Sequence, residues 1–183
     1  TAETAPERAN SMLFFIYSNA ACPHIALFSP NFRQLTSMFE RSKTFMNPGC
    51  HASGFISLVY PLIAGGILPT DYPVASFSLT GYSGGGKKMI KEYEEEKTLP
   101  LASPRQYGLF QKHKHLPEIM KVCKLCETPL FSPIVADYYA GMEVTVGFHT
   151  GFLQLPCGLP GDITLEDFHS IFEKQYKDSK FIK

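Results

Sequence analysis

The clearest pattern of apolar and polar positions begins after the turn sequence Asn47-Pro48-Gly49. Apolar residues recur at helical spacing from residue 55 to residue 63, which predicts a helix that begins near Cys50 with one buried face. The Gly65-Gly66 pair is expected to end it. Pro61 lies inside this stretch and cannot donate a hydrogen bond to the carbonyl of Ser57, so we expect a kink or an early end of the helix there.

Three later segments have the apolar pattern of strands, at residues 74–79, 130–135 and 142–148. The last of these alternates strictly, which places four apolar side chains on one face: Met142, Val144, Val146 and Phe148.

Three further segments are expected to be helical. They are residues 87–97 after a glycine-rich turn, a stretch that begins at Pro117, and a last helix from about Thr164. The last helix is expected to carry a single stripe of Leu165, Phe168, Phe172 and Tyr176. Strands and helices are mixed without a βαβ rhythm, so the pattern indicates an α+β domain with a mixed, largely antiparallel sheet. Residues 1–44 have no clean periodicity and are expected to form loops with one short buried strand or helix.

Composition narrows the possible partners and compartment. The 183 residues are 44% hydrophobic and 19% charged, which is typical of one packed globular domain. Lys+Arg and Asp+Glu number 17 each, so no basic excess favours nucleic acid. The longest apolar run, residues 12–17, is too short for a membrane span or a signal-peptide core, so no membrane partner is expected. The 5 cysteines are odd in number and irregularly spaced, which favours a reducing compartment, and we expect a cytoplasmic protein.

Cys50 is the first candidate for chemistry. A tight turn delivers it to the start of a helix, where free backbone N–H groups and the helix dipole favour a thiolate and could also hold an oxyanion. A buried structural cysteine remains the alternative interpretation.

Two other motifs have both a chemical and a plain interpretation. His113-Lys114-His115 could supply a general acid or base beside charges that suit an anionic substrate, or it could be a solvated basic loop. The segment from Gly81 to Lys88 nearly matches the phosphate-binding pattern G-x-x-x-x-G-K-[ST]. However, Lys88 occupies the last position, where that pattern needs a hydroxyl for Mg²⁺. Its consecutive glycines could still bind a phosphate through their N–H groups, or serve backbone shape alone.

Cys123 and Cys126 form a Cys-x-x-Cys motif soon after the two histidines. Together these residues could form a zinc site. Because a helix is expected to begin at Pro117, the two pairs should lie on different elements, which argues against zinc. No thioredoxin-like pattern surrounds the motif to suggest a redox role.

Four motifs taken together resemble a known family. They are Asn47-Pro-Gly-Cys-His-Ala-Ser-Gly54, Thr80-Gly-Tyr-Ser-Gly-Gly-Gly-Lys-Lys88, Pro104-Arg-Gln-Tyr-Gly108 and His113-Lys-His-Leu-Pro-Glu118. In this order they resemble the N-acetyl-gamma-glutamyl-phosphate reductases, most closely the shorter, second type. The resemblance runs from about residue 47 to the mid-140s, and more loosely through the last helix.

The resemblance implies an NADPH-dependent enzyme of arginine biosynthesis that reduces N-acetyl-L-glutamyl 5-phosphate to the 5-semialdehyde and releases phosphate. No metal is implied. Cys50 would be the nucleophile that forms a thioester, and His113 its acid/base partner ahead of His115. The other implied site residues are Ser83, Gly84 and Gly85 near the cofactor, and Arg105, Tyr107, His115 and Glu118 near the substrate.

The same resemblance implies a fold like the catalytic domain of the glyceraldehyde-phosphate dehydrogenase family, with helices on one face of the sheet and a homo-oligomer, dimer or tetramer. The family also has a Rossmann domain, whose glycine fingerprint this chain lacks. We therefore expect residues 45–183 to be a catalytic domain shortened at its C-terminus. Residues 1–44 would be a remnant of the cofactor domain or a connection to it. His51 stands where many relatives carry an aromatic or apolar residue, which we interpret as variation within the second type.

Other functions remain open at this point. A sister reductase could act on aspartyl or aminoadipyl phosphate. The chain could also be a non-catalytic fragment used for assembly, or a zinc-binding module.

Overall fold

The computed structural model describes residues 12–18 as a strand, together with residues 49–155, 163–179 and 182. The elements follow in the order β1 (Met12–Ser18), α2 (Cys50–Ala64), β2 (Ala75–Gly81), α3 (Gly86–Glu94), β3 (Arg105–Gln106), α4 (Leu116–Cys123), β4 (Leu130–Ala136), β5 (Met142–Phe148) and α5 (Leu165–Tyr176). Three short 3₁₀ helices, η1 (Tyr82–Gly85), η2 (Leu99–Ala102) and η3 (Thr150–Phe152), lie between them.

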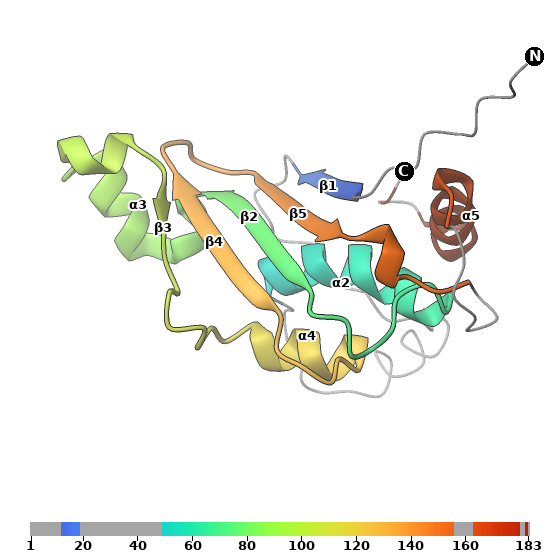
Figure 1. The fold of residues 1–183 in the computed structure, drawn as a ribbon. Helices are drawn as coiled ribbons and strands as arrows, with labels where there is room; N and C mark the ends of the chain where they lie inside the picture. Colours follow the sequence, from blue (N-terminus) through green and yellow to red (C-terminus); the bar gives the residue numbers. More distant parts are fainter. Residues whose placement is uncertain (1–11, 19–48, 156–162, 180–181, 183) are drawn as a thin grey trace, which may run out of the picture.

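The strands form one five-stranded sheet in the order β1-β5-β2-β4-β3 (Figure 1). β2 and β4 run parallel, with Ser78 opposite Pro133, while the other three neighbouring pairs are antiparallel. The expected mixed, largely antiparallel sheet of an α+β domain is confirmed. Within 1–44, residues 12–18 form the edge strand β1; the rest of that range lies outside the described residues.

The main core lies between the sheet and α2, which runs along one face with α4 beside it (Figure 1). The alternating residues of β5 point into this core as predicted, and they meet the apolar side of α2 at Phe55, Val59 and Leu62. A Cβ added at Gly54 would lie 2.6 Å from a methyl group of Val144, so glycine lets the helix approach the strand closely. The expected helices on one face of the sheet are confirmed.

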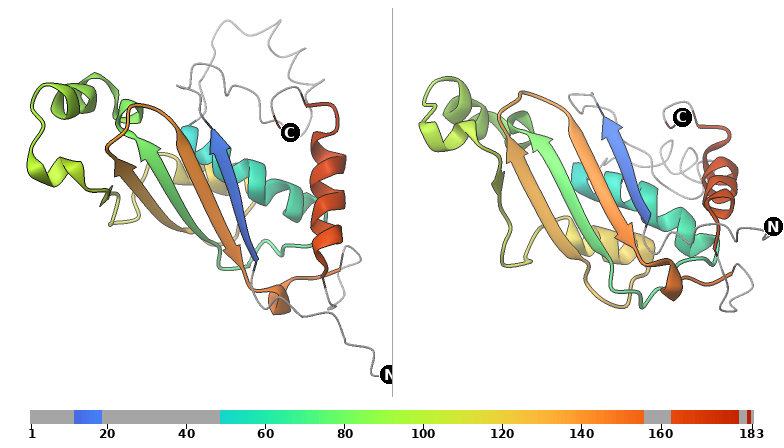
Figure 2. Two further views of the ribbon diagram at one scale, coloured as in Figure 1. Left: turned by 90° about the horizontal axis from the view of Figure 1, so that it is seen from above. Right: turned by 45° about the horizontal axis from the view of Figure 1, so that its top comes forward.

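Three details of the helices differ from the sequence-based expectation, and the simplest is that α3 ends at Glu94 and does not reach residue 97. α2 does not end early at Pro61 but continues to Ala64, with Gly65 as its C-cap. The carbonyl of Ser57, which Pro61 cannot serve, accepts a hydrogen bond from the hydroxyl of Tyr176 at 2.8 Å. This bond comes from α5, which packs at the carboxyl end of α2 (Figure 2). α2 can therefore continue past Pro61, because Tyr176 of α5 supplies the hydrogen-bond donor that the proline lacks.

α5 begins at Leu165, close to the expected start near Thr164. Thr164 is its N-cap, and the side chains of Thr164 and Asp167 form a reciprocal capping box. Leu165, however, is 59% exposed, so it does not belong to the buried stripe. Phe168 is buried, and Phe172 packs against the core. Leu165 is the first residue of the helix, and the stripe begins only where α5 meets α2.

Candidate functional site

The turn before α2 presents Cys50 as the first residue of the helix. Gly49 is the N-cap, with an extended backbone, and its carbonyl accepts hydrogen bonds from both the backbone N–H and the hydroxyl of Ser53, at 2.8 and 3.0 Å. Its N–H donates to Oε2 of Glu118 on α4, at 3.1 Å. The half-buried Cys50 is thus held where the N–H groups of the first helical turn are clustered. This is the placement that the sequence predicts.

The imidazole of His115 lies directly against the turn that carries Cys50. A Cβ at Gly49 would lie 2.1 Å from Cδ2 and 2.2 Å from Nε2 of His115, so only glycine fits there. His115 is 7% exposed, and its Nδ1 has no hydrogen-bond partner among the described residues. Burial, and after it the charges of His113 and Lys114, lower the pKa of His115 to about 4. The ring is therefore neutral near pH 7 and able to accept a proton.

His113 packs against His115, which lies between it and the turn. Its ring centroid is 4.6 Å from that of His115, and its Nδ1 accepts a hydrogen bond from the backbone N–H of His115 at 3.3 Å. Burial, with a smaller effect of Lys114, lowers its pKa. The ring is half-buried and borders a cavity of about 320 Å³ whose wall includes Lys112 and Met120. Of the two histidines in the motif, His113 is the one with access to open space.

His51 lies at the centre of the cluster, although sequence reasoning treated it only as a family variation. Its Nδ1 is 2.8 Å from Oγ of Ser78 on β2, and its Nε2 is 2.7 Å from the hydroxyl of Tyr107. Its ring centroid lies 5.9 Å from that of His113 and 5.6 Å from that of His115. The signal in the sequence was an ionisable residue in the first turn of an otherwise apolar helix.

The segment that carries Tyr107 is fixed along the edge of β4. The pairing of Arg105 with Val135 continues into a hydrogen bond from the N–H of Tyr107 to the carbonyl of Pro133, at 3.0 Å. Further along, the side-chain amide of Gln111 bonds both the carbonyl and the N–H of Phe131, at 2.8 and 2.9 Å. These contacts hold Tyr107 and the following histidines over the start of α2.

Burial raises the pKa of Tyr107 to about 12, and negative charge at Cys50 adds to the effect. Its phenol therefore keeps its proton at neutral pH. Together, Cys50, His51, Tyr107, His113 and His115 form the cluster that is called the cysteine site below.

Ser83, Gly84 and Gly85 form a second group, past the carboxyl end of β2. They belong to η1, and the N–H of Ser83 donates to the carbonyl of Tyr139 at 2.9 Å. A Cβ at Gly85 would lie 2.5 Å from the sulfur of Met89, so this glycine also serves the tight junction with α3.

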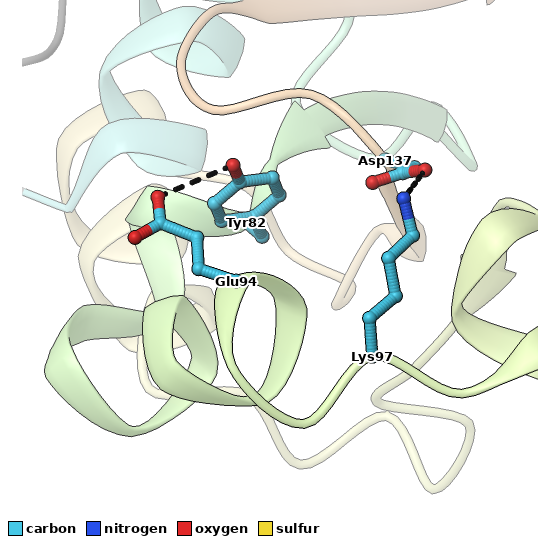
Figure 3. Close-up of polar contacts among 4 residues, drawn as sticks. All are labelled: Tyr82, Glu94, Lys97 and Asp137. Carbon is cyan, nitrogen blue, oxygen red and sulfur yellow. Dashed lines mark hydrogen bonds and ion pairs between the residues drawn. The ribbon is translucent and has the colours of Figure 1, made fainter.

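Polar and aromatic contacts anchor α3 and the segment after it at this end of the sheet. Tyr82 stacks on Tyr93, with ring centroids 4.7 Å apart. Its hydroxyl donates to Glu94, and Lys97 pairs with Asp137 (Figure 3). Arg105 belongs to this end, 3.7 Å from the carboxylate of Glu92 and over the ring of Tyr93. Arg105 and the glycines of η1 thus share the end of the sheet where β2 finishes.

The two other cysteines within the described ranges lie on other parts of the fold. Cys123 is buried, and burial raises its pKa to about 12, while Cys126 is exposed with its sulfur 3.6 Å from the hydroxyl of Thr70. Within the described ranges, no group of three or more His, Cys, Asp or Glu side chains is arranged to hold a metal ion. None of the described helices is both long enough and apolar enough to cross a membrane. Cys22 and Cys157 lie outside the described residues.

Comparison with known proteins assigns the family. The sequence model of the family described as "Semialdehyde dehydrogenase, dimerisation domain" matches residues 50–183. A protein of Chelativorans sp. (strain BNC1) named N-acetyl-gamma-glutamyl-phosphate reductase is 39% identical over 138 residues, which are 74% of this chain and 42% of that protein.

Two further relatives agree. A protein of the same name from Burkholderia orbicola is 37% identical over 142 residues, 77% of this chain and 44% of its own length. N-acetyl-gamma-glutamyl-phosphate reductase 2 of Pseudomonas putida is 32% identical over 150 residues, 82% and 46% of the two lengths. The chain spans less than half the length of these relatives. By the match over residues 50–183, the chain belongs to the semialdehyde dehydrogenase dimerisation-domain family.

Proposed function

We propose that this chain carries the catalytic domain of an NADPH-dependent N-acetyl-gamma-glutamyl-phosphate reductase. The reaction would reduce N-acetyl-L-glutamyl 5-phosphate to N-acetyl-L-glutamate 5-semialdehyde and release phosphate. The relatives' names supply the substrate. The observation that carries the proposal is the placement of Cys50 on the first turn of α2 with an imidazole packed against the same turn.

Cys50 is proposed as the nucleophile. Its thiolate would attack the acyl carbon of the substrate, form a thioester and expel phosphate. The N–H groups at the start of α2 favour the thiolate and can hold the oxyanion that forms during the attack. Glu118 supports this arrangement by holding the N–H of Gly49, so its proposed role is to fix the turn.

His115 is the stronger geometric choice for the acid/base group. It touches the turn that carries Cys50, whereas His113 contacts His115 and borders the cavity. The neutral ring of His115 can take the thiol proton, and the thiolate charge then stabilises the resulting imidazolium. This order reverses the sequence-based expectation, in which His113 came first. Tyr107 is proposed to border the substrate.

The dinucleotide, when bound, supplies the hydride that reduces the thioester. Ser83, Gly84 and Gly85 are the proposed contacts. They fit this role because Gly84 and Gly85 expose their backbone at the carboxyl end of β2, where α/β sheets commonly bind ligands. Arg105, exposed at the same end, is proposed to attract the anionic substrate.

We also propose that the sheet face opposite α2 forms the interface of a homo-oligomer, a dimer or a tetramer. The family description names a dimerisation domain. On that face Phe77 is 49% exposed and Leu130 is 55% exposed, on neighbouring strands. A partner subunit would remove these side chains from water.

The test uses a step that needs no hydride. The chain is incubated with N-acetyl-L-glutamyl 5-phosphate, and both phosphate release and the acyl adduct are followed, the adduct by peptide mass spectrometry. We expect about one phosphate per chain and the adduct on Cys50, and neither product with Cys50→Ala. Adducts on Cys126 alone, or release that survives Cys50→Ala, would refute the mechanism. Faster acylation by aspartyl or aminoadipyl phosphate would reassign the substrate, and a folded chain without acylation would favour the assembly module.

A further inference from the structure

His51 joins three elements at the cysteine site. It sits in the first turn of α2, and its ring is hydrogen-bonded on one side to Ser78 of β2 and on the other to Tyr107 beside β4. Only 3% of the residue is exposed, so water does not compete for these bonds. Phe131 packs against the ring in an edge contact, with centroids 5.4 Å apart. The imidazole is therefore held by two specific polar contacts inside an apolar frame.

A neutral imidazole carries one N–H and one free lone pair, so its two hydrogen bonds must run in the same direction around the ring. In one arrangement Tyr107 donates to Nε2 and Nδ1–H donates to Ser78. In the other, Ser78 donates to Nδ1 and Nε2–H donates to the oxygen of Tyr107. Only the second arrangement leaves the phenolic proton of Tyr107 free for another acceptor.

The surroundings keep both partners in the required protonation state. Burial, and after it the charges of His115 and His113, lower the pKa of His51 to about 3, so the ring stays neutral. Tyr107 keeps its proton, and its hydroxyl is near enough to feel charge at Cys50. Because this hydroxyl bonds the ring of His51, the residue that follows Cys50 in the first turn of α2, a thiolate at Cys50 can serve as the acceptor for the phenolic proton.

We propose that His51 is a positioning residue which, by accepting a hydrogen bond from Ser78 and donating one to Tyr107, turns the Tyr107 hydroxyl towards Cys50 to stabilise its thiolate. The inference rests on the proposed role of Cys50 as the nucleophile. Ser78, His51 and Tyr107 then act as one chain of hydrogen bonds that ends at the sulfur. No proton is transferred along these hydrogen bonds, since each hydroxyl and the imidazole keep the proton that they carry.

The proposal makes the links interdependent. If His51 acts on Cys50 only through Tyr107, removing either residue should produce the same change, and removing both should add nothing. Separate packing effects would instead add together. The double-mutant comparison therefore distinguishes two roles for His51. One is to act on Cys50 through the hydrogen-bond series Ser78–His51–Tyr107, called the relay below, and the other is merely structural.

The experiment measures the pH dependence of iodoacetamide alkylation at Cys50, resolved from Cys126 by peptide mass spectrometry. The chains are the unmodified protein, His51→Phe, Tyr107→Phe and the double variant. We expect each single variant to raise the pH midpoint of alkylation by about one unit, which makes alkylation at pH 7 roughly tenfold slower. The double variant should match the single ones. The other ionisable groups facing His51, His113 and His115, with Lys114 beside them, are the same in all four chains.

Ser57→Ala is the matched control. Ser57 is a buried serine of the same helix whose hydroxyl donates to the carbonyl of Gly54, so its loss should leave the midpoint unchanged. Ser78→Ala covers the case in which His51→Phe does not fold, and it should shift the midpoint in the same direction. His51→Gln, which can still donate from near the position of Nε2, should recover part of the shift.

Unchanged midpoints, or shifts that add in the double variant, would overturn the proposal. Alkylation needs neither the acyl phosphate nor the dinucleotide. A shared shift in a chain that the acyl phosphate fails to acylate would therefore refute the proposed function and leave the relay standing. Acylation of Cys50 together with shifts that add in the double variant would support the proposed function and refute the relay.

Discussion

The backbone N–H of Gly49 donates to the carboxylate of Glu118, which lies 69 positions later in the chain. This one contact ties the turn before Cys50 to α4, the helix that follows His115. The proposed nucleophile, Cys50, and the imidazole proposed to activate it are thereby fixed relative to each other, although they come from distant parts of the sequence.

Replacing Glu118 should loosen this connection. Glu118→Ala removes a charge-assisted acceptor from a partly buried N–H, and we expect a loss of about 1 kcal/mol in the free energy of unfolding, measured by urea denaturation. Cys50 alkylation should slow in the same variant because the turn loses its support. Glu118→Gln keeps an acceptor oxygen and should retain most of the stability. Equal losses in the two variants would show that charge, and not the hydrogen bond to Gly49, is what matters.

Gly49→Ala tests the contact with His115. The new methyl group would occupy the space of the imidazole, so the ring or the turn must move. We expect the free energy of unfolding to fall by about 1–3 kcal/mol. Urea denaturation measures the loss. His115→Ala vacates that space, so adding Gly49→Ala to it should cost much less than Gly49→Ala alone.

Gly151→Ala is the control for this experiment, because among the described residues, apart from its two chain neighbours, its added methyl group meets no atom within 4 Å. Additive costs for the Gly49 and His115 substitutions would mean that the two residues do not compete for the same space.

Local patterns in the sequence predicted much of the fold. The strict alternation of residues 142–148 predicted both the bounds of β5 and its buried face, because a strand on a helix layer has period two. The start of α2 followed from turn chemistry before Cys50. The continuation of α2 past Pro61 was not predictable in this way, since it depends on Tyr176, over a hundred residues away.

The cysteine site shows the same division. Cys50 and the two histidines of the His-Lys-His motif were recognisable from their local context. The sequence could not show which of the two histidines lies against the turn before Cys50. That depends on how α4 packs against the turn, which brings the ring of His115 to Gly49. His51 was missed for a similar reason: its partners Ser78 and Tyr107 come from two other segments.

Tyr176→Phe tests the compensation at Pro61. The variant leaves the carbonyl of Ser57 without the hydroxyl that replaces the helical donor, and we expect a loss of about 1 kcal/mol in the free energy of unfolding. Pro61→Ala restores an N–H at the regular helical position. In that background Tyr176→Phe should cost clearly less, and an undiminished cost would mean that Tyr176 acts through packing alone.

Phe77→Asp tests the proposed interface. A carboxylate on the open sheet face would be buried without a partner in the oligomer, so the variant should shift towards the monomer in sedimentation velocity at a fixed concentration. Leu99→Asp is the control, because Leu99 is 89% exposed on η2, which is not part of the sheet. Equal effects of the two substitutions, or none from Phe77→Asp, would place the interface elsewhere.

The histidines of the cysteine site should make stability depend on pH below neutrality. The pKa is about 3 for His51 and about 4 for His115 in the folded chain, against an ordinary value of 6.5. Groups whose pKa is lowered by folding bind protons more readily when unfolded. Their contribution to stability is therefore complete above about pH 6.5 and declines as the pH falls towards 4. Each such proton contributes a slope of at most about 1.4 kcal/mol per pH unit.

Urea denaturation between pH 6.5 and 5 measures this slope, in a window that lies mostly above the titration of ordinary carboxylates. His115→Asn and His51→Phe should each flatten the curve by removing one of these protons, and the double variant should be flatter still. A slope that persists in the double variant would assign the acid sensitivity to His113, whose pKa is also lowered by burial, or to groups outside the cysteine site.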